Sequence, residues 1–487
     1  MAQKSIKKNY IYNLTYQILT LIIPLIITPY LSRVFGAEGI GTCSYIDSIS
    51  SYFVLFATLG LTTFGQREIS YVQDDRRKRS TIFWETNIIE LIASLLCIVA
   101  YVAFSFTQEN TNMYLVLVLN LFSVIVNISW FFQGMEEFGK IVLRNIIFKI
   151  INIIYIFVFV KTKDDIVIYL FGVAFFELIN NLSYWISVPQ YIDKPIFKEL
   201  HPSRHMKTVI ALFVPTIAIQ VYTVLDKTMI GIITKSSFEN GYYEQASKIA
   251  KLVLTIVTSL GTVMIPRIGY HYNRGDNEIV KGYMYRAYKF VWFCGIPLTF
   301  GMIAVSSNFV PWFFGSGYDK VVSLLGILSF LILAIGINNV TGIQYLIPTK
   351  RENIFTATVI VGAAINFILN FFLIQTFQSM GAAIASVVAE MTIAIIQIYI
   401  IRKEIPPFEI VKCGVHYFIA GGIMFTVLML IRNFFSPSII HTLELVVIGG
   451  SIYGVMLLIM KDDFVLSNIN KILKKFSRNL DAEKGEN

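Results

Sequence analysis

Three glutamates lie inside long apolar runs of this chain, where a carboxyl group could carry a proton or bind a cation. They are Glu90, Glu177 and Glu390, and the last two each follow the start of a run by about eleven residues. If the runs cross a membrane, a charge near the bilayer centre costs at least about 2.5–3.5 kcal/mol. Such residues usually face a polar cavity on a substrate or ion path. The alternative for each glutamate is a buried structural partner.

Lysine and arginine also occur in or beside these runs. Lys248 and Lys251 are three residues apart and therefore share one helix face. A cavity with surplus cations suits an anion, because arginine binds a phosphate bidentately and lysine acts as a point charge. The alternative, for cations close to a helix end, is to reach the water interface. The predicted cationic, substrate-binding cavity is formed by Arg33, Arg67, Lys149, Lys227, Lys248, Lys251 and Arg267.

No enzyme motif accompanies these charges. The five histidines are scattered, the four cysteines form no CxxC pair, and the chain contains no HExxH, GxSxG or P-loop motif. We therefore predict that the protein is not an enzyme and that it has no catalytic residue, metal or cofactor. A membrane glycan polymerase is the less favoured alternative. The net charge of +9 does not indicate nucleic-acid binding, because the basic residues lie in short loops between apolar runs.

The apolar runs that must position these charges are long enough to be transmembrane helices. The chain is 55% hydrophobic and 15% charged, whereas soluble domains carry about 25% charged residues. About 20 apolar residues cross a bilayer as a helix. Fourteen runs lie near 11–31, 44–64, 82–106, 113–133, 141–160, 166–188, 208–233, 246–266, 287–306, 320–347, 354–375, 379–401, 413–431 and 439–460. The predicted fold class is an all-α polytopic membrane protein with about 14 transmembrane helices.

The basic residues are distributed unequally between the two sides of this arrangement. With the N-terminus inside, the inside tails and loops hold 29 of the 40 Lys and Arg residues, the outside loops hold five, and six lie within the runs. Positive charge favours the cytoplasmic side. This bias predicts a multi-pass protein with both termini in the cytoplasm.

A weak internal repeat divides the helices. Gly41, Ile49 and Arg67 recur 200 residues later as glycine, isoleucine and arginine. The repeat predicts two pseudo-symmetric six-helix bundles, residues 1–200 and 201–403, related by an axis along the membrane normal. Residues 404–487 would then form two extra helices and a basic cytoplasmic tail.

Five segments carry a family resemblance. They are Asn13 with PLIITPYLSRVFGAEGIGTCSYIDSISSYF (24–53), FGQREIS (64–70), WFFQGMEEFGKIVLRNIIFKI (130–150), IPTKRENIFTATVIVGAAINFILNFFLI (347–374) and MGAAIASVVAE (380–390). With these segments the chain resembles the polysaccharide repeat-unit flippases (Wzx-type). These form the oligosaccharide flippase family of the multidrug/oligosaccharidyl-lipid/polysaccharide exporter superfamily.

The resemblance implies a transport function. Two six-helix bundles would alternate in access around a central cationic cavity and move an undecaprenyl-pyrophosphate-linked oligosaccharide repeat unit to the outer leaflet, for capsule or O-antigen type polysaccharide. The cations named above would contact the headgroup, and the three glutamates are candidates for ion or proton coupling. Implied partners are the lipid-linked oligosaccharide, membrane lipids, and a polysaccharide polymerase or other assembly proteins. The implied location is the bacterial cytoplasmic (inner) membrane.

Two other cargoes remain open alternatives. One is another lipid-linked precursor, of peptidoglycan or teichoic type. The other is a drug moved by an ion-coupled multidrug exporter. A cationic drug would favour an acidic cavity, which the surplus of basic residues opposes.

Overall fold

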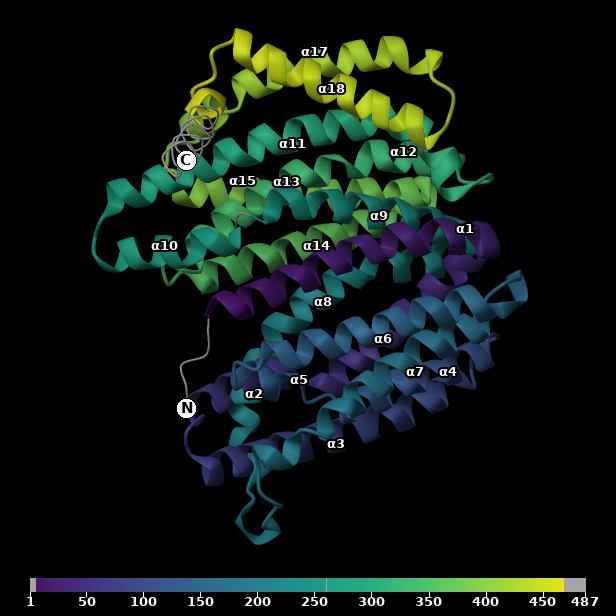
Figure 1. Cartoon of the computed structure of the whole chain (residues 1–487), viewed down its shortest axis with the longest axis vertical. Coiled ribbons are helices and arrows are strands. Elements are labelled where there is room, and N and C mark those ends of the chain that lie inside the picture. The colour runs from purple at the N-terminus through teal and green to yellow at the C-terminus, as the bar shows by residue number, and fades with distance from the viewer. Residues whose placement is uncertain (1–5, 260, 468–487) are drawn as a thin grey trace, which may run out of the picture. The chain divides into compact units, whose positions relative to one another are not determined.

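The computed structural model describes residues 6–259 and 261–467, and the regular elements described there are all helical (Figure 1). The helices form two compact units, residues 1–244 and 245–487. The division lies inside one helix, α9 (Ser237–Thr258). The internal repeat of the sequence instead predicts a boundary between the two bundles at residue 200, and this boundary remains a prediction.

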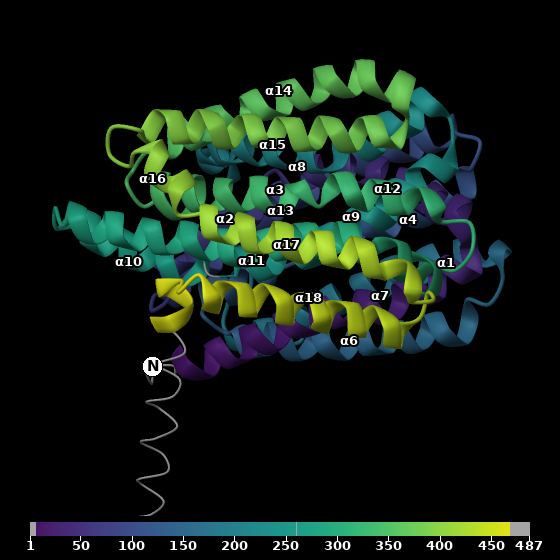
Figure 2. The ribbon, with the colours of Figure 1, turned by 90° about the horizontal axis from the view of Figure 1, so that it is seen from above.

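The first unit consists of long helices that run nearly side by side (Figures 1 and 2). Helix α4 packs against α7, and α1 packs against both α3 and α8. The helices of this unit before α9 are α1 (Ile6–Thr58), α2 (Leu61–Tyr71), α3 (Arg76–Ser105), α4 (Thr111–Ile125), α5 (Ser129–Gly134), α6 (Phe138–Phe159), α7 (Ile166–Trp185) and α8 (Met206–Thr234).

The second unit contains most of α9 and the helices that follow it. Helices α14 and α15 form one packed pair, and α17 and α18 form another that rests on α11. The elements after α9 are α10 (Gly261–Asn273), α11 (Asn277–Phe314), α12 (Asp319–Leu328), α13 (Phe330–Asn338), the π-helix η5 (Asn339–Leu346), α14 (Glu352–Phe377), α15 (Ser379–Ile401), α16 (Pro407–Lys412), α17 (Val415–Ile431) and α18 (Ile439–Ile459).

The fourteen predicted apolar runs each lie on one of these helices or on two or three successive ones. Helix α1 carries the first run and most of the second. A kink at Gly36 separates the two parts of this helix; Gly36 has φ 65° and ψ −179°, a conformation that glycine adopts at little cost. Over the described residues, eleven helical segments are long and apolar enough to cross a membrane, and α1 with α2 counts as one of them. The runs 208–233 and 246–266 lie on α8 and on α9 with α10. The predicted fold class, an all-α polytopic membrane protein, is confirmed.

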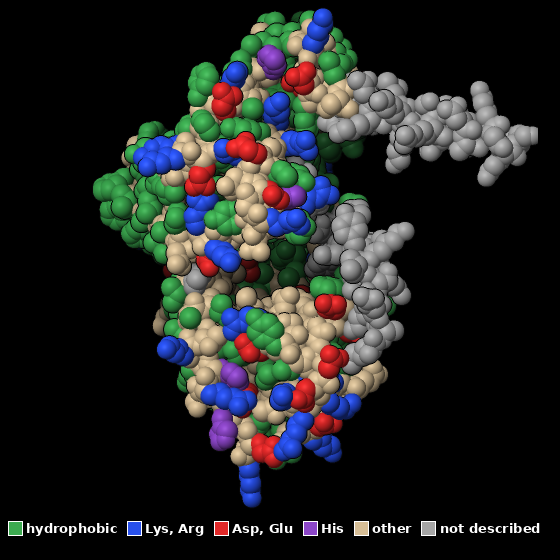
Figure 3. Space-filling model, turned by 90° about the vertical axis from the view of Figure 1, so that its left-hand side faces the viewer, with side chains coloured by type: hydrophobic (Ala, Val, Ile, Leu, Met, Phe, Trp, Pro, Cys, Tyr) green, Lys and Arg blue, Asp and Glu red, His purple; other side chains and the backbone are tan. Residues whose placement is uncertain are grey.

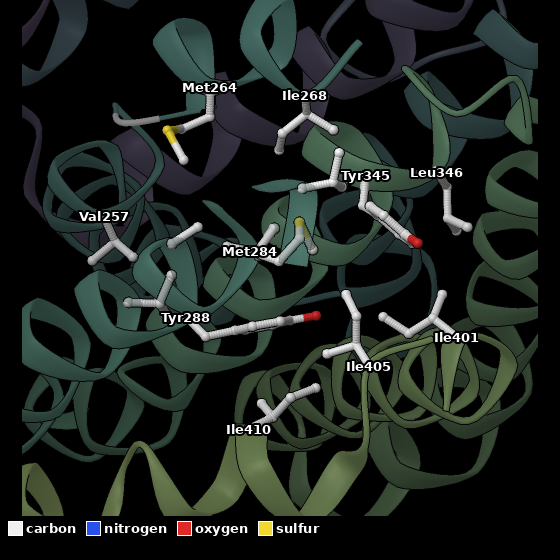
Figure 4. Close-up of a cluster of buried hydrophobic side chains, with 14 of the residues drawn as sticks. Val257, Met264, Ile268, Met284, Tyr288, Tyr345, Leu346, Ile401, Ile405 and Ile410 are labelled. Carbon is white, nitrogen blue, oxygen red and sulfur yellow. The ribbon is translucent and has the colours of Figure 1, made fainter. Parts of the chain in front are cut away.

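Burial follows the pattern of a membrane protein. Large apolar side chains such as Leu96, Val99 and Ile459 are about two-thirds exposed on the outer faces of helices, where lipid tails are as apolar as a protein core. Some polar groups inside the units are hydrogen-bonded between helices. In the second unit, side chains from α9, α10, α11, η5, α15 and α16 converge on one buried cluster (Figure 4), where the hydroxyl groups of Tyr288 and Thr341 lie 2.8 Å apart.

Charged side chains gather at one end of the helices. Figure 3 shows Lys, Arg, Asp and Glu side chains interspersed with polar and apolar ones on the face of each unit that is turned to the viewer. The turn between α10 and α11 lies at this end of the second unit, and the chain between α2 and α3 lies at this end of the first (Figure 1). Both segments belong to the loops predicted to face the cytoplasm.

Candidate functional site

A polar cavity lies inside the first unit, between α1, α4, α7 and α8. Its volume is about 390 Å³, which is within the range of small-molecule sites. Two carboxylates, Asp47 and Glu177, line it. The neutral polar residues that share the lining are Ser50, Ser51, Tyr52, Thr58, Thr62, Asn120, Ser123, Asn127, Asn181, Thr216 and Gln220.

Each of the four helices contributes a stripe of residues spaced by three or four positions, which places them on one helix face. On α7 the stripe is Glu177 and Asn181, and on α8 it is Thr216, Gln220 and Val224. The other residues of α7 and α8 are mainly apolar. A polar stripe on an otherwise apolar helix therefore produces the cavity.

Glu177 faces this cavity from the middle of α7. It is exposed although it lies far from both helix ends, because the space beside it is hollow. Asn181, one turn further along α7, is buried, and its amide donates a 2.8 Å hydrogen bond to Ser123 Oγ on α4. Lys149 on α6 is near enough to attract Glu177 electrostatically. Glu177 thus combines an exposed side chain that lines the cavity with a basic neighbour.

The other two predicted glutamates are buried in different surroundings. Glu90 is 1% exposed on α3, where its Oε2 has no hydrogen-bond partner among the described residues and Trp130 is its polar neighbour. Glu390 is 9% exposed on α15 and accepts a hydrogen bond from Asn338 at the end of α13. Asn338 Nδ2 also donates to the Glu390 carbonyl at 3.1 Å. Neither residue lines the cavity of the first unit.

The predicted cations of the first unit do not form one cluster. Arg33 is exposed on α1, and its Nη1 donates to the carbonyl of Pro29 at 3.3 Å. Arg67 on α2 pairs with Glu68 at 2.8 Å. Lys227 on α8 pairs with Glu244 on α9 at 2.5 Å, and both side chains are largely buried. At least two of these four cations, Arg67 and Lys227, are therefore bound to carboxylates.

The remaining predicted cations belong to the second unit. Lys251 on α9 and Arg267 on α10 are exposed, and Lys248 is half-buried one turn from Lys251. Among the described residues no group of three or more His, Cys, Asp and Glu side chains could hold a metal ion.

Helices α1 and α9 cross at two glycines that are 200 positions apart. A Cβ added to Gly41 would lie 1.6 Å from the backbone oxygen of Ser237, and one added to Gly241 would lie 1.9 Å from the backbone oxygen of Ala37. Residues 37 and 237 are also 200 apart, so the two contacts are reciprocal, as a local two-fold axis requires. Ser44 donates a 3.0 Å hydrogen bond to Glu244, again at an offset of 200.

Sequence reasoning missed most of the cavity lining. The sequence singled out Glu177, but not Asp47, the asparagines or Gln220. The available signal was the three- and four-residue spacing of amide and hydroxyl side chains within the apolar runs.

Comparisons with known proteins agree with this architecture. Residues 6–270 match the model of a family described as “Polysaccharide biosynthesis protein”. The chain is 24% identical over 410 residues to “Putative O-antigen transporter” of Escherichia coli (strain K12), which covers 82% of this chain and 97% of that protein. A protein of the same name from Shigella dysenteriae is 22% identical over 392 residues, covering 78% of this chain and 96% of that one.

Solved structures share the fold. “Lipid II flippase MurJ, inward closed conformation” is 16% identical with a TM-score of 0.74, and the match covers 94% of this chain and all of that one. An inward-facing multidrug resistance MATE family transporter of the MOP superfamily is 14% identical with a TM-score of 0.57, over 84% of this chain and 98% of that one. At these identities the likeness concerns the fold alone.

Proposed function

This chain belongs to the polysaccharide biosynthesis protein family, and from that premise we propose that it is a flippase for a lipid-linked oligosaccharide. The cargo would be an undecaprenyl-pyrophosphate-linked repeat unit, moved from the cytoplasmic to the outer leaflet of the bacterial cytoplasmic membrane. Its product would supply a surface polysaccharide of capsule or O-antigen type. The observation that carries the proposal is the match to the O-antigen transporter relatives along nearly their whole length.

Such a transporter must move a polar headgroup across the apolar interior of the bilayer. Moving an unpaired hydroxyl or amide into hydrocarbon costs several kcal/mol per group, and a pyrophosphate costs far more. A polar cavity removes most of this cost by replacing water with hydrogen-bonding side chains. The cavity of the first unit offers amides, hydroxyls and two carboxylates within apolar helices, which supports the proposal.

The apolar cavity of the second unit suits the lipid tail. Its volume is about 400 Å³, and it lies between α9, α11, α12, α17 and α18. Leu298, Met302, Phe309, Leu428 and Leu445 are among the apolar side chains that line it. An isoprenoid chain buried there would gain about 25 cal/mol per Å² relative to water but little relative to lipid. The cavity would therefore guide the tail rather than bind it tightly.

In this proposal the seven predicted cations contact or steer the headgroup as the two bundles alternate in access. Glu177 is the favoured proton carrier, because it combines a position far from both helix ends with access to a polar cavity. Glu90 and Glu390 remain candidates for coupling. Both termini would lie in the cytoplasm, and a polymerase and other assembly proteins would receive the product.

The test is complementation followed by reconstitution. We expect deletion of the gene to abolish surface polysaccharide and to leave its lipid-linked precursor in the cytoplasmic leaflet. The full chain in proteoliposomes should move that extracted precursor between leaflets. Glu177→Gln should reduce transport at equal protein level, whereas Glu109→Gln, a change at an exposed glutamate in the α3–α4 loop, should not. Normal surface polysaccharide in the deletion strain, with no precursor accumulated, would refute the proposal.

A further inference from the structure

A second polar cavity lies at the end of the first unit that is predicted to face the cytoplasm. Its volume is about 510 Å³, and it is formed by α2, by α5 and by the turn into α6. Three glutamine side chains line it: Gln66, Gln73 and Gln133. Gln66 and Gln73 lie on one face of α2 and its C-terminal extension, together with Thr63 and Ser70, because their spacings are three and four residues.

The walls of this cavity are held rigidly by the chain around Gly134. A Cβ there would lie 2.8 Å from the backbone oxygen of Gln66 and 2.9 Å from the Ile69 side chain, so α2 and α5 touch through their backbones. Gln73 Nε2 donates a 2.6 Å hydrogen bond to the Gly134 carbonyl. Behind this contact, Trp130, Phe131 and Phe132 are fully buried. Such support fixes the positions of side chains that bind a ligand.

The amides of Gln66 and Gln133 have no hydrogen-bond partner among the described residues, and Gln66 is exposed. Each primary amide supplies two donors and an oxygen acceptor. A sugar hydroxyl also donates and accepts, so neighbouring hydroxyls on one ring match an amide. Phe138 adds one aromatic face to the lining.

The charges around this cavity disfavour an anion. Arg67 is its one cation among the described lining residues, and Glu68 accepts from both its Nε at 3.1 Å and its Nη2 at 2.8 Å. Glu136, with φ 57°, adds a second carboxylate at the rim. A phosphate would have to displace Glu68 and approach Glu136, whereas a neutral sugar meets neither cost.

We infer that this cavity is a glycan-binding subsite, which holds a sugar ring of the cargo by neutral hydrogen bonds and leaves the pyrophosphate to other residues. The inference rests on the proposed flippase function. It assigns sugar recognition to the glutamines beside Arg67, whereas the sequence predicted only that Arg67 belongs to a cationic, substrate-binding cavity. Because the subsite lies at the predicted cytoplasmic end, it would select the oligosaccharide before translocation.

Two lipid probes separate sugar recognition from pyrophosphate recognition. The full chain in nanodiscs is titrated with the lipid-linked oligosaccharide fraction extracted from the gene-deleted host, and with undecaprenyl pyrophosphate, which carries no sugar. We expect Gln66→Ala/Gln133→Ala to weaken binding of the sugar-bearing lipid by about 10-fold, from two neutral hydrogen bonds, and to leave binding of undecaprenyl pyrophosphate unchanged. Gln108→Ala is the matched control, because Gln108 is a partly exposed glutamine between α3 and α4 whose side-chain amide donates to its neighbour Thr107.

Each outcome decides the inference. Equal weakening for both lipids would show that the cavity holds the pyrophosphate, and unchanged binding of the sugar-bearing lipid would show that it holds nothing. Either result overturns the subsite while leaving the flippase proposal intact. If the unmodified protein bound neither probe, the proposed function itself would fail. The single variant Gln66→Ala, at an exposed side chain, provides the same comparison if the double variant does not fold.

Discussion

The glycine crossing of α1 and α9 provides the sharpest test of the structure. Replacing Gly41 by alanine would place a Cβ 1.6 Å from the backbone oxygen of Ser237. Non-bonded heavy atoms prefer about 3.5–4.0 Å, so the two helices would have to separate by roughly 2 Å. Backbone atoms cannot move aside as a flexible side chain does, and the whole crossing must therefore open.

The cost of that opening follows from what surrounds the crossing. Inserting a methyl group into a packed contact costs about 1–3 kcal/mol. The separation would also lengthen the hydrogen bonds from Ser44 to Glu244, now 3.0 Å, and from Thr42 to Ser237, now 3.1 Å. Each contributes about 0.5–1.5 kcal/mol, and more where a charge takes part. We expect Gly41→Ala to destabilise the protein by about 3–5 kcal/mol, and Gly241→Ala by a similar amount.

The assay is thermal unfolding of the purified protein in detergent. Gly422→Ala on α17 is the matched control, because a Cβ there meets nothing within 4 Å and alanine has the higher helix propensity. The control should unfold at or above the temperature of the unmodified protein, and Gly41→Ala well below it. If Gly41→Ala were as stable as Gly422→Ala, the close crossing would be absent from the protein and the reasoning from local two-fold symmetry would fail with it.

Two further predictions concern ion pairs. Lys227→Met and Glu244→Gln should each cost about 2–4 kcal/mol and together cost much less than the sum, because each single change takes the opposite charge of the pair away from a largely buried ion. An additive double variant in thermal unfolding would exclude the pair, and the exposed pair Lys281–Glu278 is the control. For Glu404, partial burial raises the pKa, but hydrogen bonds and charge from Arg351, with Tyr345, bring it below the ordinary value of 4.5. Its contribution to stability is therefore complete above pH 4.5 and is lost as the pH falls through the lowered pKa. Glu404→Gln should flatten the acid side of the stability profile, and an unchanged profile would contradict this assignment.

The helices themselves were predictable from the sequence because their signal is local. A run of about 20 apolar residues is sufficient to predict a membrane-spanning helix, whatever its neighbours are. The kink at Gly36 was not predicted. It became visible only as a positive φ within α1, since an apolar run that contains a glycine is equally compatible with a straight helix.

The candidate site was less predictable, because depth along a helix does not determine the face on which a residue lies. Glu177 and Glu390 follow the starts of their runs by the same number of residues, yet Glu177 faces a hollow and Glu390 is buried against Asn338. Amide side chains were ambiguous for the same reason. Asn370 donates to Asn366 at 3.1 Å inside a buried helix contact, whereas Asn120 lines the cavity of the first unit. Only the partner helix distinguishes a structural amide from a ligand-binding one.

Ion pairing also changes what a surplus of cations means for transport. A phosphate that bound Arg67 or Lys227 would have to displace Glu68 or Glu244, so the gain would be the difference between two ion pairs rather than a full Coulomb attraction. Weak net attraction suits a carrier, because a cargo must be bound well enough to enter and loosely enough to leave. If the charges are nearly balanced in this way, the discrimination between cargoes falls to neutral groups. In the proposed subsite the glutamine amides beside Arg67 would supply that discrimination, by matching the hydroxyl pattern of the sugar.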